Sequence, residues 1–472
     1  MSTGDSATVT PAAGEAAGAP FAPAYRLITI ALIALVTIVA FEFMAIATAM
    51  PQAAEDLDAV RSYGLAFSVM LTAQLLGIVL AGVWSDRSGP MPGLYAGQLL
   101  FAAGAAGCGL APTFPILLLG RAVTGLGAGI IIVVLYVVVG QVYPAVVRPR
   151  VFGFISAAWV LPSLVGAPLS GWLASTFTWR LVFWVVVPPA LVTLAVVVRQ
   201  SAAIRREDDR AAHGPDERSL HRRTANLGVL VALAAGLVQL GTSERFTAVS
   251  WQTLATVGGV VGLLVVTPRL LPAGTLRMAR GLPSVILSRF LLNAAFNGSI
   301  TFIPLMLTQA RGSTLAVAGA VLAVGSLGWA GGSWVQGLPS MARHRPALVS
   351  LGGLFVALGC LALVLVTAAG WLVWLFGPAM VLTGTGMGLG STSLSVLLLD
   401  LAPAGEYGKA SAALQLSDVL GSVLGIAGAS ALFASFHTGG GDTGAYLLIW
   451  GLLALVAALV IVSGRRCAAL RG

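Results

Sequence analysis

Long apolar stretches recur along almost the whole chain, and their length decides what it can become. The hydrocarbon core of a bilayer is about 30 Å thick, so a helix rising about 1.5 Å per residue needs about 20 apolar residues to cross it. Fourteen stretches are predicted as helical spans: 27–51, 62–84, 91–111, 114–140, 151–176, 179–198, 226–242, 250–267, 284–308, 315–337, 347–367, 371–397, 409–432 and 445–463. Because backbone groups in lipid must bond within their own segment, the prediction is an all-α polytopic membrane protein.

Composition supports this class and excludes others. Only 9% of the 472 residues are charged, against roughly 25% in a soluble domain. The net charge of +9 does not indicate a nucleic-acid partner, because the arginines fall in short loops between spans. The three cysteines are scattered and the four histidines all fall in predicted loops, so we expect no disulfide framework, no metal site and no cofactor.

The polar segments divide the spans into two halves. We predict a disordered cytoplasmic tail over 1–25, an N-terminal six-helix bundle over 26–198, a cytoplasmic arginine-rich linker over 199–225, two inserted helices with a connector over 226–282, a C-terminal six-helix bundle over 283–463 and a cytoplasmic tail over 464–472. With both termini inside, 20 of the 26 basic residues fall on the cytoplasmic side, as the positive-inside rule requires.

One acid interrupts the first apolar stretch. Counted along the helix from Arg26, Glu42 lies a little beyond the membrane midplane. An unpaired charge there costs several kcal/mol, so it needs a partner, an aqueous cavity or a function. We interpret Glu42 as a proton or substrate site, the alternative being an acid held by a neighbouring helix for packing alone.

A second acid, Asp418, lies near the middle of the thirteenth stretch. It belongs to a polar stripe on one helical face, made up of Ser411, Gln415, Asp418 and Ser422. Asn293 and Asn297, one turn apart in the ninth stretch, are expected to join it. We predict a proton-coupling role for Asp418 and a substrate cavity lined by the two asparagines and Gln415. The alternative is a set of hydrogen-bonded helix contacts.

Four motifs in chain order identify a family resemblance. A cytoplasmic loop is predicted at Gly82-Val-Trp-Ser-Asp86-Arg87-Ser-Gly89, and it resembles the G-x-x-x-D-[RK]-x-G loop signature of the major facilitator superfamily. Arg121-Ala-Val-Thr-Gly125-Leu-Gly127 is similar to the R-x-x-x-G-x-G element of its fourth span. Gly166-Ala-Pro168-Leu-Ser-Gly171 resembles the antiporter signature of the fifth span, and Trp179-Arg180 resembles the start of the sixth span in the drug:proton antiporters.

The resemblance implies roles for these residues. Asp86, with Gly82, Arg87 and Gly89, would form a gating loop, although Pro90, Met91 and Pro92 stand where the family has basic residues. Arg121 lies inside the fourth span and needs an acid, for which Glu42 is the most economical partner. Fourteen spans, with two inserted between the halves, resemble one drug-exporter branch. Separately, the pairs Gly125/Gly129 and Gly421/Gly425 have the G-x-x-x-G spacing of close helix contacts.

The function expected from these features is secondary transport by alternating access. We predict a monomeric, proton-coupled exporter of drugs or other small lipophilic molecules in the cell membrane, with the bilayer, protons and substrate as its partners. An uptake symporter or facilitator is the first alternative, and a membrane receptor or enzyme on a transporter-like scaffold is the second. No nucleotide-binding loop or nucleophile motif supports an enzyme, so we expect none.

Overall fold

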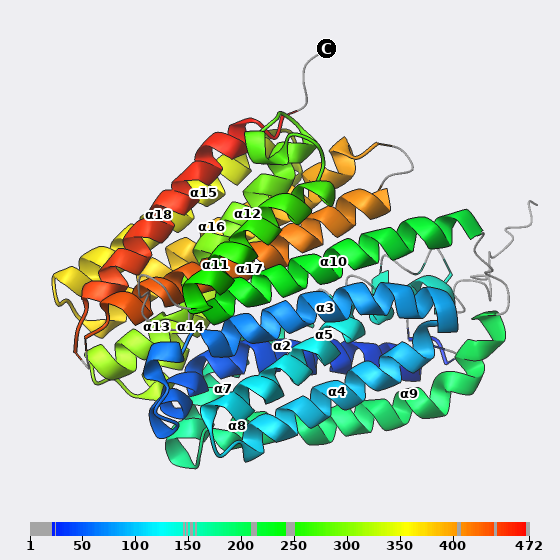
Figure 1. The fold of residues 1–472 in the computed structure, drawn as a ribbon, viewed down its shortest axis with the longest axis horizontal. Helices are drawn as coiled ribbons and strands as arrows, with labels where there is room; N and C mark the ends of the chain where they lie inside the picture. Colours follow the sequence, from blue (N-terminus) through cyan, green and yellow to red (C-terminus); the bar gives the residue numbers. More distant parts are fainter. Residues whose placement is uncertain are drawn as a thin grey trace, which may run out of the picture.

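The computed structural model shows a bundle of long helices lying roughly along one direction (Figure 1). It describes residues 21–23, 25–144, 147, 150, 151, 154, 155, 158–208, 215–241, 251–403, 407–438 and 441–468. In this part of the chain there is no β-strand. The main helices are α2 (Arg26–Asp56), α3 (Leu65–Ser88), α4 (Pro90–Leu110), α5 (Phe114–Val142), α7 (Val160–Thr176), α8 (Arg180–Trp184), α9 (Val187–Asp208), α10 (Pro215–Gly241), α11 (Trp251–Val266), α12 (Leu282–Thr301), α13 (Ile303–Leu305), α14 (Leu315–Gly337), α15 (Arg345–Ala368), α16 (Phe376–Leu401), α17 (Tyr407–Phe436) and α18 (Gly444–Arg465).

The predicted spans correspond closely to these helices. Among the described residues, twelve helices are long and apolar enough to cross a membrane. The other two predicted spans appear as α7, which has 17 residues, and as the shorter apolar part of α10, Asn226–Gly241. The all-helical membrane class is therefore confirmed, and the count of fourteen stays a prediction. Residues 1–20 of the predicted tail and 209–214 of the predicted linker lie outside the described residues, while α9 and α10 extend into the linker from either side.

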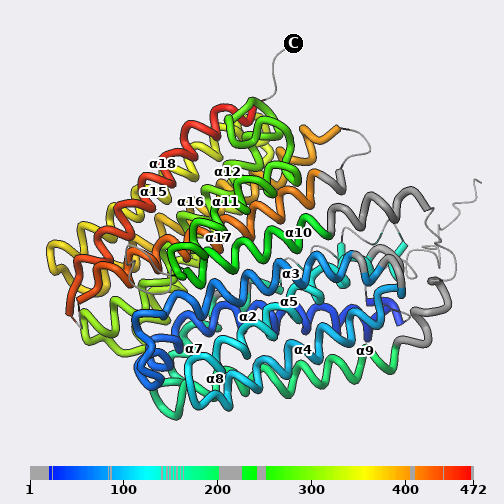
Figure 2. The backbone as a smooth tube through the Cα atoms, in the orientation of Figure 1, coloured from blue at the N-terminus to red at the C-terminus, as the bar shows by residue number. Residues whose placement is uncertain are grey.

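Two lobes of helices make up the molecule (Figures 1 and 2). The N-terminal lobe contains α2, α3, α4, α5, α7, α8 and α9, and the C-terminal lobe contains α12, α14, α15, α16, α17 and α18. The lobes meet along two seams, where α3 packs against α17 and α7 packs against α14. In Figure 1 they converge at the left and diverge towards the right.

The inserted helices α10 and α11 pack on each other and are fastened mainly to α3. The amide of Gln239 on α10 donates a hydrogen bond of 3.0 Å to the carbonyl of Ser68 on α3 and a second one to the hydroxyl of Thr72. A smaller contact links α10 to α17. The hairpin therefore belongs to the N-terminal lobe and covers the seam between α3 and α17.

The end at which the lobes converge, here named the closed end, contains the last turn of α2 and the first turn of α3. It is joined by a hydrogen bond of 2.9 Å from the Tyr63 hydroxyl to the Thr301 carbonyl and by one of 3.1 Å from the Gln309 amide to Glu55. Buried apolar side chains form a continuous core across this end, whereas a second core stays within the N-terminal lobe. The closed end therefore holds the lobes together, and the opposite end is the open end.

Glycines allow the closest helix contacts, as their spacing predicted. A side chain at Gly125 or Gly129 of α5 would meet the backbone of α3, and one at Gly421 or Gly425 of α17 would meet the backbone of α12. Both G-x-x-x-G pairs therefore serve packing within a lobe.

The predicted loop at Gly82–Gly89 is wrong in its secondary structure. Helix α3 continues to Ser88, so Gly82 and the backbones of Asp86 and Arg87 belong to its last turns. The turn is made by Gly89 alone, whose φ of 72° is accessible to glycine, and Pro90 then starts α4. A segment rich in polar residues can thus remain helical when one glycine supplies the whole reversal.

We expect the closed end to face the outside of the cell. Cysteines placed at Ala342, just before α15, and at Leu372, just after it, test this orientation. Both positions are exposed, and they lie on the two sides of a single membrane-spanning helix. In intact cells an impermeant maleimide should modify Leu372→Cys and leave Ala342→Cys unmodified until the cells are opened. The reverse pattern would invert the topology. The native cysteines Cys108, Cys360 and Cys467 are buried and give little background.

Candidate functional site

The first intramembrane ion pair joins Glu42 on α2 to Arg121 on α5. Arg121 Nη1 donates to Glu42 Oε1, and the two side chains are only 1–2% exposed. Arg121 Nε also donates a hydrogen bond of 2.9 Å to the carbonyl of Ala66 on α3. Glu42 Oε2 is buried and accepts no hydrogen bond from the described residues. The partner predicted for Glu42 is therefore the one it contacts.

This arrangement satisfies one oxygen of the carboxylate and leaves the other without a partner. A buried polar atom without a hydrogen bond costs about 1–3 kcal/mol, and more when it is charged. A proton on Glu42 would lower that cost, because a neutral acid loses less on burial than a carboxylate, but it would leave the buried Arg121 guanidinium without a counter-charge. The pair is therefore arranged so that gain or loss of one proton changes the local energy by a large amount.

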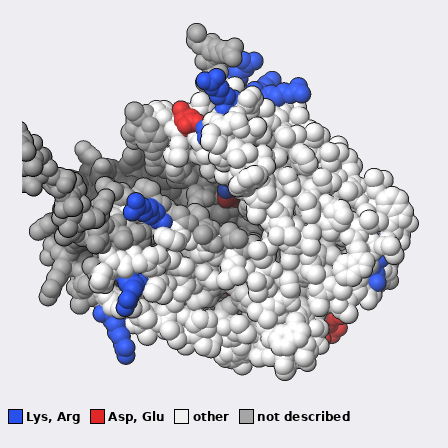
Figure 3. Space-filling model, turned by 180° about the vertical axis from the view of Figure 1, so that it is seen from behind, with Lys and Arg blue, Asp and Glu red and all other residues white. Residues whose placement is uncertain are grey.

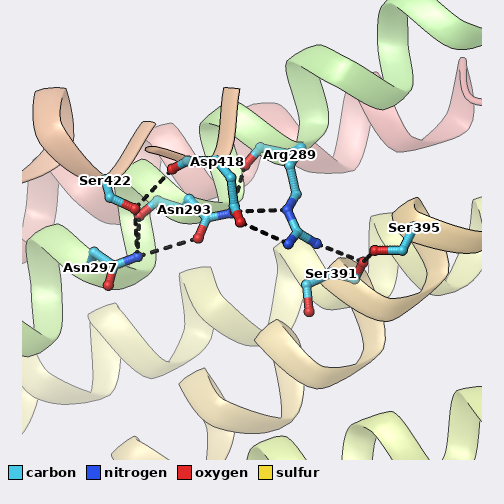
Figure 4. A network of polar contacts seen from close by, with 7 residues as sticks. All are labelled: Arg289, Asn293, Asn297, Ser391, Ser395, Asp418 and Ser422. Carbon is cyan, nitrogen blue, oxygen red and sulfur yellow. Dashed lines mark hydrogen bonds and ion pairs between the residues drawn. The ribbon is translucent and has the colours of Figure 1, made fainter. Parts of the chain in front are cut away.

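The second intramembrane pair joins Arg289 on α12 to Asp418 on α17 (Figure 4). It is bidentate, with distances of 2.8 Å from Nε to Oδ1 and 3.0 Å from Nη2 to Oδ2. Arg289 Nη1 also donates to the carbonyl of Ser391 on α16, at 2.8 Å. One guanidinium thus ties three helices of the C-terminal lobe together, with the planar fork that suits arginine to carboxylates.

The predicted asparagines continue this network along α12. The Asn293 amide donates to the carbonyl of Arg289 at 3.1 Å, and the Asn297 amide donates to Asn293 and to the hydroxyl of Ser422, the latter at 3.0 Å (Figure 4). Both asparagines are buried. Gln415 is exposed on α17, about one turn before Asp418 on the same face.

The two pairs differ in their access to solvent. The side chains of Arg289 and Asp418 retain 14% and 25% exposure, against 1–2% for Arg121 and Glu42. Figure 3 shows that the molecule is hollowed between the lobes, with charged atoms visible inside the hollow and a broad uncharged surface around it. The second pair is therefore partly accessible to solvent, while the first is sealed among α2, α3 and α5.

The remaining predicted residues lie at helix contacts. On α7, Gly166 faces α2, and a side chain at Gly171 would meet the backbone of α14 near Leu315. Pro168 lies between them, and Gly319 of α14 approaches the backbone at this turn. The segment that resembles an antiporter signature therefore forms the seam between the lobes. The side chains of Asp86 and Arg87 lie outside the described part of the structure, and Gly82 approaches no neighbour closely.

Two residues were missed in the sequence analysis. The sequence analysis assigns no role to Arg289, although the argument that gave Arg121 an acid applies equally to it. His437 follows the end of α17 as predicted, yet it is only 5% exposed and is packed against aromatic rings. Its neighbourhood depends on tertiary packing, which the sequence does not show.

The comparisons with known proteins agree with this architecture. The family model described as Major Facilitator Superfamily matches residues 32–426. The chain belongs to this superfamily. An uncharacterised transporter of the superfamily from Mycobacterium tuberculosis strain H37Rv is 26% identical over 449 residues, covering 91% of this chain and 62% of the relative. The multidrug efflux pump SdrM of Staphylococcus aureus is 27% identical over 169 residues, covering 36% of this chain and 38% of the pump.

Solved structures of other transporters share the fold. A peptide transporter POT in complex with sulfate has a TM-score of 0.69 at 16% identity, covering 96% of this chain and 98% of that one. A D-xylose-proton symporter has a TM-score of 0.61 at 16% identity, covering 92% and 97%. At these identities the likeness concerns the arrangement of helices, and substrates do not transfer.

Proposed function

We propose that the chain is a proton-coupled exporter of small lipophilic molecules that works as a single subunit in the cell membrane, with both termini in the cytoplasm. Its lobes would alternate between the observed state, closed at one end, and a state closed at the other. Glu42 with Arg121 would bind and release the proton, and the hollow beside Arg289 and Asp418 would hold the substrate.

The observation that carries the proposal is the sealed Glu42 carboxylate, one oxygen of which has no partner among the described residues. A structural ion pair gains most when both oxygens are hydrogen-bonded, so an incompletely satisfied acid at this depth supports a role in which the group changes its protonation state. The hollow and the accessible second pair give a separate place for a substrate. The gating segment Gly82–Gly89 and the seam at Gly166–Gly171 would change their contacts as the lobes exchange.

The proposed direction is export, supported by the similarity to a multidrug efflux pump of Staphylococcus aureus, and a multidrug transporter of Bacillus subtilis supports the substrate class. The energy is sufficient. One proton moving inward through 100 mV and one pH unit releases about 3.7 kcal/mol, which sustains a roughly 500-fold gradient of a neutral substrate.

Everted membrane vesicles test direction and coupling together. A panel of fluorescent lipophilic dyes is added outside the vesicles, and a pH gradient is imposed with the vesicle lumen acidic. We expect vesicles containing the protein to accumulate at least one dye several-fold and to lose it when a protonophore collapses the gradient. Accumulation only in right-side-out vesicles, with the gradient reversed so that the exterior is acidic, would show uptake. Transport that does not respond to the protonophore would show that the protein is not proton-coupled.

A further inference from the structure

His437 lies in an unusual place for a titratable residue. It is the first residue after α17, its side chain is 5% exposed, and its Nδ1 accepts no hydrogen bond from the described residues. Its ring stacks on Phe433 with centroids 4.4 Å apart and planes inclined by 18°. The ring of Tyr446 on α18 contacts the rings of both Phe433 and His437. A neutral imidazole suits these surroundings better than a charged one.

The rings around His437 continue across the seam between the lobes. Phe433 contacts Phe302 with centroids 5.2 Å apart, and Phe302 contacts Tyr63 at 5.5 Å. Tyr63 belongs to the N-terminal lobe and donates its hydroxyl to the Thr301 carbonyl of the C-terminal lobe. All four side chains are buried. The histidine is therefore one end of an aromatic series that closes this end of the molecule.

Three groups act on His437 from the elements packed around it. Burial lowers the pKa of His437, the carboxylate of Asp442 in the α17–α18 loop opposes this, and Arg61 of the short helix Val60–Ser62 adds to the lowering. Asp442 itself is held ionised, because hydrogen bonds from the Gly444 and Thr438 amides and from the Thr438 hydroxyl lower its pKa. Tyr446 contributes a neutral phenol.

We infer that His437 is a second proton-binding site, separate from Glu42, and that its protonation opens the closed end. A proton there places a positive charge inside the aromatic series, where it is repelled by Arg61 of the opposite lobe, whose short helix Val60–Ser62 packs against α17. Separation of the lobes relieves both effects, because it moves Arg61 away and admits water to the imidazolium. With the closed end outside, an acidic exterior would favour the outward-open state, in which a proton can next enter the protein.

The sign of the pH effect follows from linkage. The closed state binds the proton on His437 more weakly than a state in which the ring meets water, so the histidine stabilises the closed state at pH values above about 6.5. This stability is lost as the pH falls below that value towards the lowered pKa of the closed state. Between the two pKa values, the ratio of open to closed molecules rises by up to about tenfold per pH unit.

Distances between spin labels across the closed end test this inference without any substrate. Labels are attached to cysteines at Ser175, exposed at the end of α7, and Leu372, exposed between α15 and α16. The full chain, with its native cysteines replaced, is measured in lipid nanodiscs at pH 7.5 and 5.5. We expect one short distance at pH 7.5 and an additional longer distance at pH 5.5.

Variants separate protonation of His437 from other causes. His437→Phe keeps a ring for stacking and cannot titrate, so the longer distance should be missing at both pH values. His437→Arg should show it already at pH 7.5, and His344→Phe, at an exposed histidine of the opposite end, should behave as the parent. The response should survive in Glu42→Gln, which distinguishes it from the proposed coupling site. A pH response that persists in His437→Phe, a longer distance in that variant at both pH values, or no response in the parent would each overturn the inference.

Discussion

Glu42→Gln is expected to abolish accumulation of substrate driven by a pH gradient while leaving enough folded protein in the membrane for the measurement. Glutamine keeps the shape of the side chain, and its amide oxygen can accept the bond from Arg121 Nη1. Because Arg121 then loses its counter-charge, we expect a loss of stability of about 3–5 kcal/mol, and transport is compared at equal amounts of folded protein. The amide cannot bind or release a proton near neutral pH. A transporter that exchanges substrate for a proton at this residue then has no second ion to exchange.

The expected magnitude follows from the driving force. With a pH difference of one unit and no membrane potential, a one-proton exchanger can concentrate a neutral substrate about tenfold. We expect this ratio to fall to one in Glu42→Gln, whereas passive equilibration of a neutral substrate continues. The measurement is the steady-state dye ratio in proteoliposomes with an imposed pH gradient.

A control on the same helix is available. Glu55→Gln changes an exposed acid in the last turn of α2, where the amide can still accept the hydrogen bond from Gln309, and should transport like the parent. If Glu42→Gln still concentrates substrate under a pH gradient alone, Glu42 is structural. Asp418 would then become the leading candidate for proton coupling.

The sequence predicts the parts of this fold that depend on local pattern. Span boundaries follow from apolar length, and α14 begins and ends where the sequence places the span 315–337. The contact between Glu42 and Arg121 follows from the cost of a charge in lipid, since each residue needs the other. The first conclusion needs the sequence of only one helix, and the second needs only two charges of opposite sign at similar depth.

Other features depend on how segments pack against one another or on a single turn residue, and the composition of one segment does not predict them. The Gly82–Gly89 segment has the polar composition of a loop, but the helix continues because Gly89 alone can adopt a positive φ and reverse the chain. The sequence does not determine which residue pairs with Asp418, because several polar side chains lie at a similar depth. The bidentate contact with Arg289 depends on how α12 and α17 cross. His437 shows the same limit, because loop position in the sequence does not exclude burial against the aromatic rings of neighbouring helices.

The second large effect is expected at the Arg289–Asp418 pair, where each single substitution should lower stability and the double substitution should largely restore it. Arg289→Gln or Asp418→Asn alone leaves an uncompensated charge near the middle of the membrane. Breaking a fully buried pair costs about 3–5 kcal/mol, and the partial exposure of this pair reduces the cost to about 1–3 kcal/mol. The double variant carries no charge and should recover most of that loss. Thermal unfolding in detergent, read from intrinsic fluorescence, measures all four proteins.

Transport should not recover together with stability in the double variant. If the hollow holds the substrate beside this pair, two amides replace the charges that a ligand contacts, and transport should stay more than tenfold below the parent. The peripheral pair Arg345–Asp400, at 3.4 Å and more exposed, gives a matched control whose removal should change stability by less than about 1 kcal/mol. Additive losses in the double variant would show that Arg289 and Asp418 are not energetically coupled. A stable double variant with full transport would show that the pair only fastens α12 to α17, because a charged group that a substrate contacts in the hollow cannot be neutralised without changing transport.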